Sequence, residues 1–260
     1  MKVVDITEEH LPLYLLCLED WSDEVREAGP RKKYWYEKKR GTGLGVKLAL
    51  DDKGVVGGMI QYWPIEDSWA EGRDLFFIHC IWVHGHKQGR GNFQKRGMGT
   101  ALLTAAEEDA RARGAKGMAA WGLSMPFWMK ASWFKKHGYR FADKNGIAVL
   151  LWKQFSADAK APRWIKQRKT PGATPGKVTV TSFVNGWCTA GNMTNERAKK
   201  AAAGFGDKVA FREIVTSDSG VMREWGMSDA LFVDDKEVTI GPPPTVEKIR
   251  KAIARKVGRL

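Results

Sequence analysis

The segment with the clearest chemical potential is 94–100 (QKRGMGT), which follows an apolar strand-like run and opens a helix-like one. A helix N-terminus presents unpaired backbone N–H groups and the positive end of the helix dipole, which together suit a phosphate. Gly97 and Gly99 let the backbone approach a diphosphate without a Cβ in the way, and Lys95 and Arg96 add positive charge. The spacing differs from a Walker A loop and from a dinucleotide-binding GxGxxG, so it predicts a phosphate-binding loop of another kind.

Histidines before this loop are the candidate proton carriers. His79 lies in the apolar run Leu75–Val83 and could act as a general base near neutral pH. A histidine packed into the core of the strand is the competing interpretation. Cys80 has no evident base partner, so it is a weaker candidate for a nucleophile. His84 and His86 could ligate a metal together with His79, but no carboxylate lies nearby, and we expect no metal.

The cysteines suggest one further candidate. Cys17, Cys80 and Cys188 lie far apart and form no CxxC pair, which excludes a disulfide scaffold and a cysteine-rich zinc module. Cys188 follows Trp187 at the predicted start of a helix, where a thiol gains thiolate character. We therefore treat Cys188 as a possible reactive thiol.

The elements that must position these residues follow from periodicity and turn residues. A hairpin is expected first, followed by the order β–loop–α–β–α–β, which predicts a mixed sheet with helices on its faces. The expected elements are Gly45–Leu50, Val55–Trp63, Leu75–Val83, Gly99–Arg113, Ala115–Gly122, Met129–His137 and Ile147–Phe155. The basic and aromatic stretch Arg31–Arg40 is better explained as a solvated helix face with a buried aromatic edge than as a nucleic-acid stacking surface.

The composition limits the class of protein. The 260 residues include 43 basic and 30 acidic side chains, a net charge of +13. This excess is compatible with a solvated basic surface or with a polyanionic partner, and nucleic acid is the less favoured partner. The apolar runs are too short for a membrane helix, and the N-terminus has no signal-peptide pattern, so we expect a cytoplasmic protein that does not contact a membrane. Nothing in the sequence indicates an oligomeric state.

A shift in composition divides the chain. Residues 156–176 contain three prolines, several bases and little apolar periodicity, which is typical of an extended linker. The predicted division is therefore a first domain over 1–155, a basic Pro/Gly linker over 156–176 and a second domain over 177–260. The second domain is expected to have the order βαβαββα, with strands at Lys177–Val184 and Val209–Val215 and a later hairpin that includes Glu237–Ile240.

Two motifs in the first domain resemble a known family. Residues 94–101 fit the Q/R-x-x-G-x-G/A pyrophosphate loop of the GNAT acetyltransferase superfamily, and 133–139 (WFKKHGY) resembles its [LF]-Y-x-K-x-G-[FY] signature. Ile81–His84 resembles the end of its central strand. The resemblance covers about 1–155 and implies an α/β fold, with a GNAT-like mixed sheet flanked by helices. It also implies an acetyl-CoA-dependent N-acetyltransferase that transfers the acyl group directly to a small amine or amino-acid-like acceptor.

The same resemblance implies the cofactor-binding residues. The backbone amides of Arg96–Thr100 and of Gln94 would hold the pyrophosphate, and the strand around Ile81–Val83 would pair with the pantetheine arm. That strand would splay from Ala115–Gly122, and the thioester would lie in the gap. The implied set is Ile81, Trp82, Val83, Gln94, Lys95, Arg96, Gly97, Met98, Gly99 and Thr100.

The sequence departs from the family pattern in two places. An insertion, His84–Phe93, could cover the 3′-phosphate, form a wall of the acceptor site, or be a flexible surface loop. Phe134 stands where many members have a tyrosine that protonates the departing thiolate. Either Ser132 or Tyr139, a candidate acid, replaces this tyrosine, or the thiolate leaves unassisted, which a thiol pKa near 8.5 permits. The alternative function is a non-catalytic CoA-binding or docking protein.

The second domain looks like a small thioredoxin-like α/β domain, and Trp187-Cys188 falls where that family has W-C-x-x-C. Gly191 occupies the second cysteine position, and no proline precedes the strand expected at Ala230. These departures make dithiol chemistry improbable and leave a monothiol, docking or purely structural role. The two-domain arrangement resembles the YoaP-type acetyltransferases.

Overall fold

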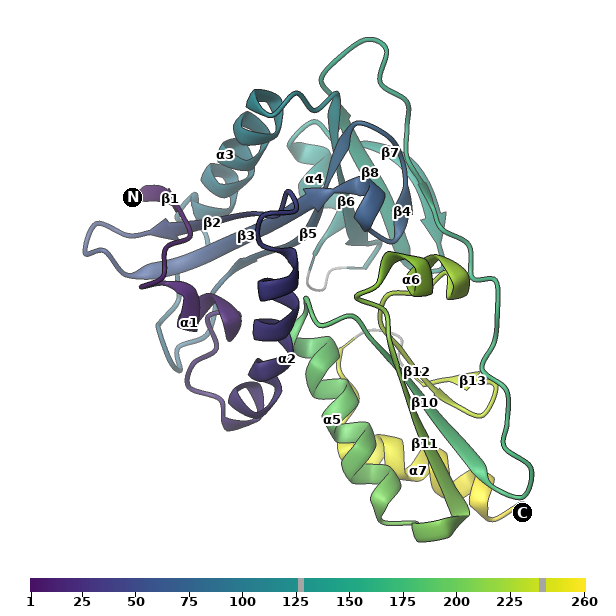
Figure 1. Ribbon diagram of the computed structural model, residues 1–260. Helices are drawn as coiled ribbons and strands as arrows, with labels where there is room; N and C mark the ends of the chain where they lie inside the picture. Colours follow the sequence, from purple (N-terminus) through teal and green to yellow (C-terminus); the bar gives the residue numbers. More distant parts are fainter. Residues whose placement is uncertain (126–128, 239–241) are drawn as a thin grey trace. The chain divides into compact units, whose positions relative to one another are not determined.

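The computed structural model describes residues 1–125, 129–238 and 242–260, and their contacts group into two compact units (Figure 1). The first unit comprises Met1–Trp21 and Lys39–Ile165, and the second comprises Ser22–Lys38 and Lys166–Leu260. This grouping differs from the division expected from the sequence in two places. Residues 22–38 belong with the second unit, and residues 156–165 belong with the first.

The first unit contains a seven-stranded mixed sheet, as the sequence predicts. Among the described strands of this sheet, only β5 and β6 pair in parallel, and the other neighbours are antiparallel. β7 has no counterpart among the expected elements. The order is β1 (Lys2–Asp5), β2 (Gly45–Leu50), β3 (Val56–Pro64), β5 (Leu75–Val83), β6 (Gly117–Leu123), β8 (Ala148–Gln154) and β7 (Arg140–Asn145).

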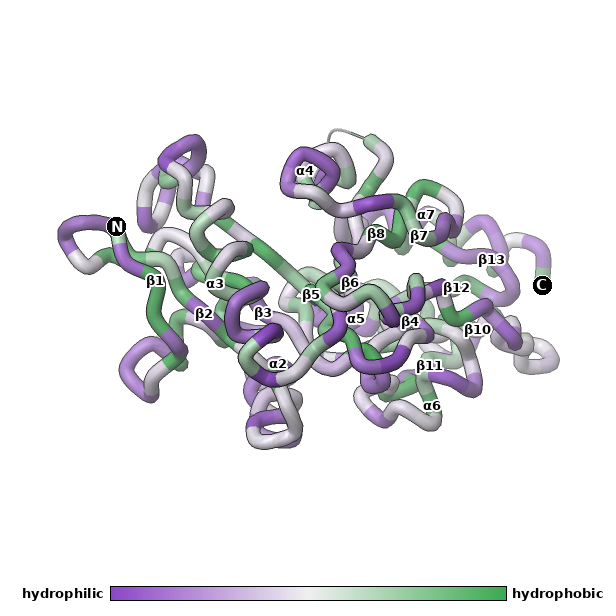
Figure 2. Tube along the Cα trace, turned by 90° about the horizontal axis from the view of Figure 1, so that it is seen from above, coloured by the Kyte–Doolittle hydropathy of each residue, from purple (hydrophilic) through white to green (hydrophobic). Residues whose placement is uncertain are grey.

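Two helices cover one face of this sheet. α3 (Met98–Ala112) repeats buried apolar residues every four positions, because residues four apart share one face of a helix. α4 (Ala131–Lys136) adds Ala131 and Phe134 to the same core. Figure 2 shows hydrophobic segments along the strands and hydrophilic ones at the turns between them. The sheet residues of this core include Ala49, Ile60, Tyr62, Phe76, Ile78, Met118, Ala120, Val149 and Leu151.

Short elements cover the opposite face: α1 (Leu11–Leu15), η1 (Ile65–Asp67), β4 (Ala70–Glu71) and β9 (Arg163–Trp164). Tyr14 of α1 is fully buried and donates a hydrogen bond to Gln61 Oε1 at 2.7 Å. β9 pairs with β4, and Trp164 of β9 is buried in the hydrophobic core on this face of the sheet. The expectation of an extended linker over 156–176 is therefore wrong for residues 163–165, because burial of Trp164 and Ile165 removes apolar surface from water.

The second unit contains a four-stranded sheet with the order β11 (Val209–Val215), β10 (Val178–Val184), β12 (Ala230–Val233) and β13 (Lys236–Glu237). β10 and β11 are parallel, and the other neighbours are antiparallel. α5 (Thr189–Ala203) and α7 (Val246–Val257) share a core on one face, and α6 (Ser219–Trp225) packs on the other (Figure 1). η2 (Gly206–Lys208) leads into β11. Residues 239–240 of the expected strand Glu237–Ile240 lie outside the described residues.

α2 (Asp23–Lys39) is attached to the second unit by ion pairs and by one large apolar side chain. Arg31 bonds Glu213 with both terminal guanidinium nitrogens and Glu196 through Nε at 3.1 Å. Trp35 is 1% exposed, and Gly186 packs against its Cβ. The structure therefore agrees with a helix that buries one aromatic edge. Further ion pairs join Glu24 to Arg197 and Glu27 to Lys200.

No helix in the described parts of the chain combines the length and the apolar composition needed to cross a bilayer.

The contacts of Arg31 predict that it contributes much more to the free energy of unfolding than Arg26, which lies on the same helix. Arg31→Met removes charge-assisted hydrogen bonds and leaves Glu196 and Glu213 partly buried without it, so we expect unfolding to require about 1–3 kcal/mol less. Arg26→Met, whose exposed pair is with Asp23, should change stability by less than about 0.5 kcal/mol. Urea denaturation of both variants measures this, and equal losses would contradict the anchoring role of Arg31.

Candidate active site

An irregularity in β5 shapes the centre of the first unit. Gln61 of β3 pairs with Cys80 and Tyr62 pairs with Ile78, so His79 is an extra residue in β5, a β-bulge. Pairing with β6 begins at Leu75 and ends where Ile78 meets Ala120. β5 continues to Val83 and β6 to Leu123, but the described residues beyond that point are not paired with each other. The two strands therefore diverge, as the resemblance implies.

Side-chain hydrogen bonds mark the two ends of the free edge of β5. Trp121 Nε1 donates to the His79 carbonyl at 2.8 Å, and Gln94 Nε2 donates to the Val83 carbonyl at 3.4 Å. Ile81, Trp82 and Val83 lie in this part of the strand and are half-buried. An exposed strand edge can accept an extended chain of amides as an added strand. The geometry thus fits an extended ligand that carries amide groups.

The N-terminus of α3 offers free backbone donors. Gly97 caps the helix with a φ of 82°, a conformation that glycine adopts without a Cβ penalty. The first helical hydrogen bond runs from Ala101 N to Gly97 O at 3.0 Å. The N–H groups of Met98, Gly99 and Thr100 therefore have no carbonyl partner within the helix, and Gly97 and Thr100 are exposed. These donors and the helix dipole are suited to binding an anion.

The loop before α3 differs from its expected role at one residue. The Gln94 N–H donates to Asn92 Oδ1 at 2.9 Å, so it is not free to hold a pyrophosphate while this bond exists. The Gln94 side chain instead contacts the end of β5. Lys95 and Arg96 are exposed, and the Arg96 guanidinium lies 5.4 Å from the Phe93 ring centre. Their charges remain available beside the anion site.

A histidine that sequence reasoning missed lies beside this site. His137 Nδ1 is 2.8 Å from the Trp133 carbonyl, which can only accept, so this nitrogen carries a proton. In the neutral ring, Nε2 then accepts a hydrogen bond from Thr100 Oγ1 at 3.0 Å. The Trp133 ring lies against that of His137, with centroids 4.2 Å apart and a tilt of 38°, and an added Cβ at Gly99 would sit 3.4 Å from the Trp133 ring. The spacing Trp133-x-x-x-His137, which places both residues on one helix face, is the sequence pattern that could have identified His137.

His79, the candidate base, is buried on the opposite face of the sheet from α3. It is 2% exposed and packs against the rings of Trp63, Trp69 and Phe77. Burial lowers the pKa of the imidazole to about 3, and the ammonium of Lys39 lowers it further, although a hydrogen bond with the Phe77 carbonyl opposes both. A pKa this low makes His79 a weak base at neutral pH, so the structure favours the core-histidine interpretation.

The candidate acids differ in their access to solvent. Phe134 is fully buried, and its ring packs edge-on against that of Tyr139 at 5.4 Å. Tyr139 is 2% exposed, and burial raises the pKa of its hydroxyl well above the usual value, with a further contribution from the Glu107 carboxylate. Ser132 is exposed on α4. Enclosure beside Glu107 does not favour Tyr139 as a proton donor to an external thiolate.

The insertion His84–Phe93 is held by hydrogen bonds at several points. His84 is buried, and its backbone bonds Gly57 O at 2.9 Å and Phe93 N at 2.8 Å. Arg90 donates to the Val56 carbonyl at 2.9 Å and pairs with Asp20 at 3.2 Å. This arrangement does not fit a freely flexible loop. Among the described residues, no group of three or more His, Cys, Asp or Glu side chains could hold a metal ion.

In the second unit, Cys188 is the N-cap of α5 and is partly exposed. A Cβ added at Gly191 would lie 2.8 Å from Asp229 Oδ1. Asp229 is partly buried, and it accepts hydrogen bonds from the Asn185 N–H and the Trp187 indole at 3.1 and 3.0 Å. A second cysteine at 191 would therefore require Asp229 to move. This contact gives a physical reason for the incomplete cysteine motif.

Comparisons with known proteins find a family match in the N-terminal part of the chain. The model of the acetyltransferase (GNAT) family matches residues 5–139. Similar solved structures include the PaiA N-acetyltransferase of Thermoplasma acidophilum with coenzyme A, at 15% identity and a TM-score of 0.44, covering 59% of this chain and 99% of that one. A ribosomal-protein-alanine N-acetyltransferase of Brucella melitensis has 18% identity and a TM-score of 0.43, covering 59% and 99%. No curated protein matches the chain.

Burial of His79 predicts a pH-dependent stability. The folded-state pKa of about 3 lies below the ordinary 6.5, so the unfolded state binds the proton first. Burial of neutral His79 therefore does not lower the free energy of unfolding above pH 6.5. That free energy falls as the pH drops from 6.5 toward 3, because the unfolded state takes up the proton. Between about pH 7 and pH 5, the free energy of unfolding should fall by about 2 kcal/mol through this residue. His79→Phe should remove this slope and His10→Gln should keep it, as measured by urea denaturation; equal slopes in wild type and His79→Phe would contradict it.

Proposed function

Because the chain belongs to the acetyltransferase (GNAT) family, we propose that it transfers the acetyl group of acetyl-CoA directly to a small amine or amino-acid-like acceptor. One juxtaposition carries this proposal: the free amides of α3 begin beside the end of β5, whose β6-facing edge pairs with no described strand. The Cβ position of Gly99 is 3.8 Å from Val83, and Gln94 bonds the Val83 carbonyl. An anion site next to a strand edge suits a ligand in which a diphosphate is joined to an amide-containing arm.

The diphosphate and the pantetheine arm of acetyl-CoA each have a complementary feature in this arrangement. The diphosphate would accept hydrogen bonds from the N–H groups of Met98, Gly99 and Thr100, and Lys95 and Arg96 would supply positive charge. The pantetheine arm would pair with β5 at Ile81–Val83. Trp133 would flank the arm where it passes Gly99. In this role, the Thr100–His137 hydrogen bond fixes the Thr100 hydroxyl beside the phosphates.

With the pantetheine arm along β5, the thioester of acetyl-CoA would lie in the gap between β5 and β6, where the reaction would take place. The neutral amine attacks the carbonyl carbon, a C–N bond forms, the C–S bond breaks, and the amine loses a proton to water. Backbone N–H groups along the free edge of β5 can stabilise the developing oxyanion. Phe134 has no hydroxyl and that of Tyr139 is enclosed, so the thiolate would leave without a proton donor. This is feasible because a thiol with a pKa near 8.5 is a tolerable leaving group at neutral pH.

The acceptor would enter a region rich in aromatic side chains. Trp121 packs against both cores of the first unit, so it spans the diverging strands. Trp63 and Trp69 lie beside His79 on the face opposite α3. Large aromatic rings exclude water and favour a compact, partly apolar acceptor.

We propose a thioredoxin-like relationship for residues 177–260, which together with the GNAT domain gives a YoaP-type two-domain arrangement. The parallel pair β10–β11, the antiparallel β12 and the helices on both faces support it. The packing of Gly191 against Asp229 argues against a dithiol, so we assign Cys188 a monothiol or docking role, or none. Acetyl transfer would not depend on it.

Gly97→Trp tests the proposed function. An indole at this open position would block the diphosphate, so CoA binding by calorimetry and amine-dependent release of free thiol from acetyl-CoA should both be lost. Gly54→Trp is the matched control, because Gly54 has a similar φ of 78° and open space but lies in the β2–β3 turn. Unchanged CoA affinity in a folded Gly97→Trp protein would refute the site. CoA binding without turnover of any amine in a broad panel would refute the enzyme and favour a CoA-binding or docking protein.

Unassisted thiolate departure makes a separate prediction. Tyr139→Phe and Phe134→Tyr should each change kcat by less than about tenfold, whereas loss of a general acid costs about 10²–10⁴-fold. The high-pH limb of the kcat profile should also stay in place in Tyr139→Phe. A loss of 10²-fold or more with a shifted limb would identify Tyr139 as the donor, and the unassisted route would be wrong.

A further inference from the structure

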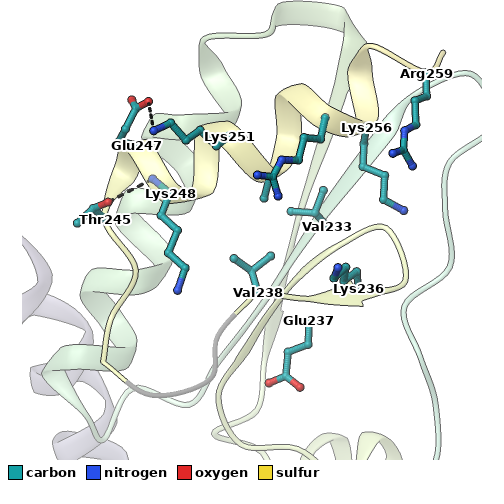
Figure 3. A pocket seen from close by; sticks show the side chains of 12 residues that line it. Val233, Lys236, Glu237, Val238, Thr245, Glu247, Lys248, Lys251, Lys256 and Arg259 are labelled. Atoms are coloured by element: carbon teal, nitrogen blue, oxygen red, sulfur yellow. Dashed lines mark hydrogen bonds and ion pairs between the residues drawn. The ribbon is translucent and has the colours of Figure 1, made fainter.

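The second unit contains a cavity that the proposed acetyl transfer does not use. It has a volume of about 770 Å³ and lies between the β12–β13 hairpin and α7 (Figure 3). Lys236 and Glu237 come from the hairpin side, and Val233 and Val238 lie at its centre. The remaining lining residues come from α7 and its ends: Thr245, Glu247, Lys248, Lys251, Ala252, Arg255, Lys256 and Arg259.

The sequence of α7 places these side chains along one stripe. The helix starts at the N-cap Thr245, whose hydroxyl accepts a hydrogen bond from the Lys248 N–H at 3.2 Å. From there, the cavity residues recur at spacings of three or four, which is one face of a helix. Ile249 and Ile253 are fully buried in the core of the second unit, on the neighbouring stripe. The hydrophobic core therefore fixes α7 with its basic stripe toward the hairpin.

The charges lining the cavity are not balanced. Six lysine and arginine side chains face two carboxylates, Glu237 and Glu247. Partial desolvation raises the pKa of Glu237, although its side chain is exposed. Glu247 pairs with Lys251 at 3.7 Å, and Lys256 pairs with Asp235 at 3.2 Å.

The unpaired cations point to an anionic ligand. Lys236, Lys248, Arg255 and Arg259 form no ion pair with any described residue. Like charges one helical turn apart repel each other, so this stripe destabilises α7 unless an anion is bound. The cavity would relieve that repulsion by accepting several negative charges at once.

We propose that this cavity binds a small molecule with two or more phosphate groups on a compact ring system, of the nucleoside di- or triphosphate class. The volume is in the range of small-ligand sites. Lys248, Arg255 and Arg259 bind the phosphates, and arginine does so with two parallel hydrogen bonds. Val233, Val238 and Ala252 provide the apolar surface on which the ring system rests. A ligand with phosphates alone would leave these methyl groups exposed to water.

Calorimetry on the full chain, saturated with CoA so that the α3 site is occupied, tests the proposal with ATP, pyrophosphate, adenosine and a single-stranded RNA oligomer as probes. ATP should bind, pyrophosphate more weakly and adenosine not detectably. Raising the salt from about 50 to about 200 mM should weaken ATP binding, because the phosphates are held by several cations.

Matched charge variants locate the site. Lys248→Gln/Arg255→Gln/Arg259→Gln should weaken ATP binding by about tenfold or more, a loss of at least about 1.4 kcal/mol. The control variant, Lys177→Gln/Lys208→Gln/Arg250→Gln, removes the same charge from exposed positions outside the cavity. Its affinity for ATP should stay within about twofold of the wild-type value. Circular dichroism confirms that both variants are folded. Equal effects of the two variants, or no ATP binding, would overturn the proposal, and so would RNA that binds more tightly than ATP and depends on the same three residues.

Discussion

The bulge at His79 is the constraint on which the rest of the first unit depends. One extra residue in β5 ends its pairing with β6 at Ile78, although both strands continue. In a regular parallel pair, β6 would occupy the edge of β5 and satisfy its backbone groups. Because the edge is left open, an external chain of amides can replace the missing strand. The helix N-terminus of α3 lies where that edge ends, so the open edge and this N-terminus are the two halves of the proposed cofactor site.

The same bulge determines which face of the sheet the neighbouring side chains of β5 occupy. Ile78, Ile81 and Val83 all pack toward the α3 core, a spacing of three and then two that a regular strand would not allow. His79 is directed into the tryptophan-rich face, where burial holds it in the neutral form. The residue that allows the strands to separate is therefore fixed by aromatic packing, and its contribution is structural.

Local patterns in the sequence were sufficient to predict much of this arrangement. The bounds of β2, β5 and β11 agree with the expected segments, and α3 begins within one residue of its expected start. The glycines and bases of 94–100 predicted the helix N-terminus at which we propose that the diphosphate binds, because a helix N-terminus is determined by neighbours in the chain. These features need no knowledge of distant contacts.

Features that depend on tertiary packing could not be predicted in this way. The ion pairs of Arg31 with Glu196 and Glu213 join positions more than 160 residues apart, so the membership of α2 in the second unit was not visible. The use of the Gln94 N–H by Asn92 and the enclosure of Tyr139 beside Glu107 depend on side-chain conformations. Burial of Trp164 depends on a partner strand, β4, that has only two residues.

The central claim is that the open edge of β5 receives acetyl-CoA as an added strand. Amide hydrogen exchange of the full chain, followed with and without saturating acetyl-CoA, tests it most directly. The account predicts slower exchange in two segments, Ile81–Val83 and Met98–Thr100, and unchanged exchange in β10, whose two edges are already paired. Protection of Met98–Thr100 with no change at Ile81–Val83 would contradict it, because the cofactor would then bind by its phosphates alone.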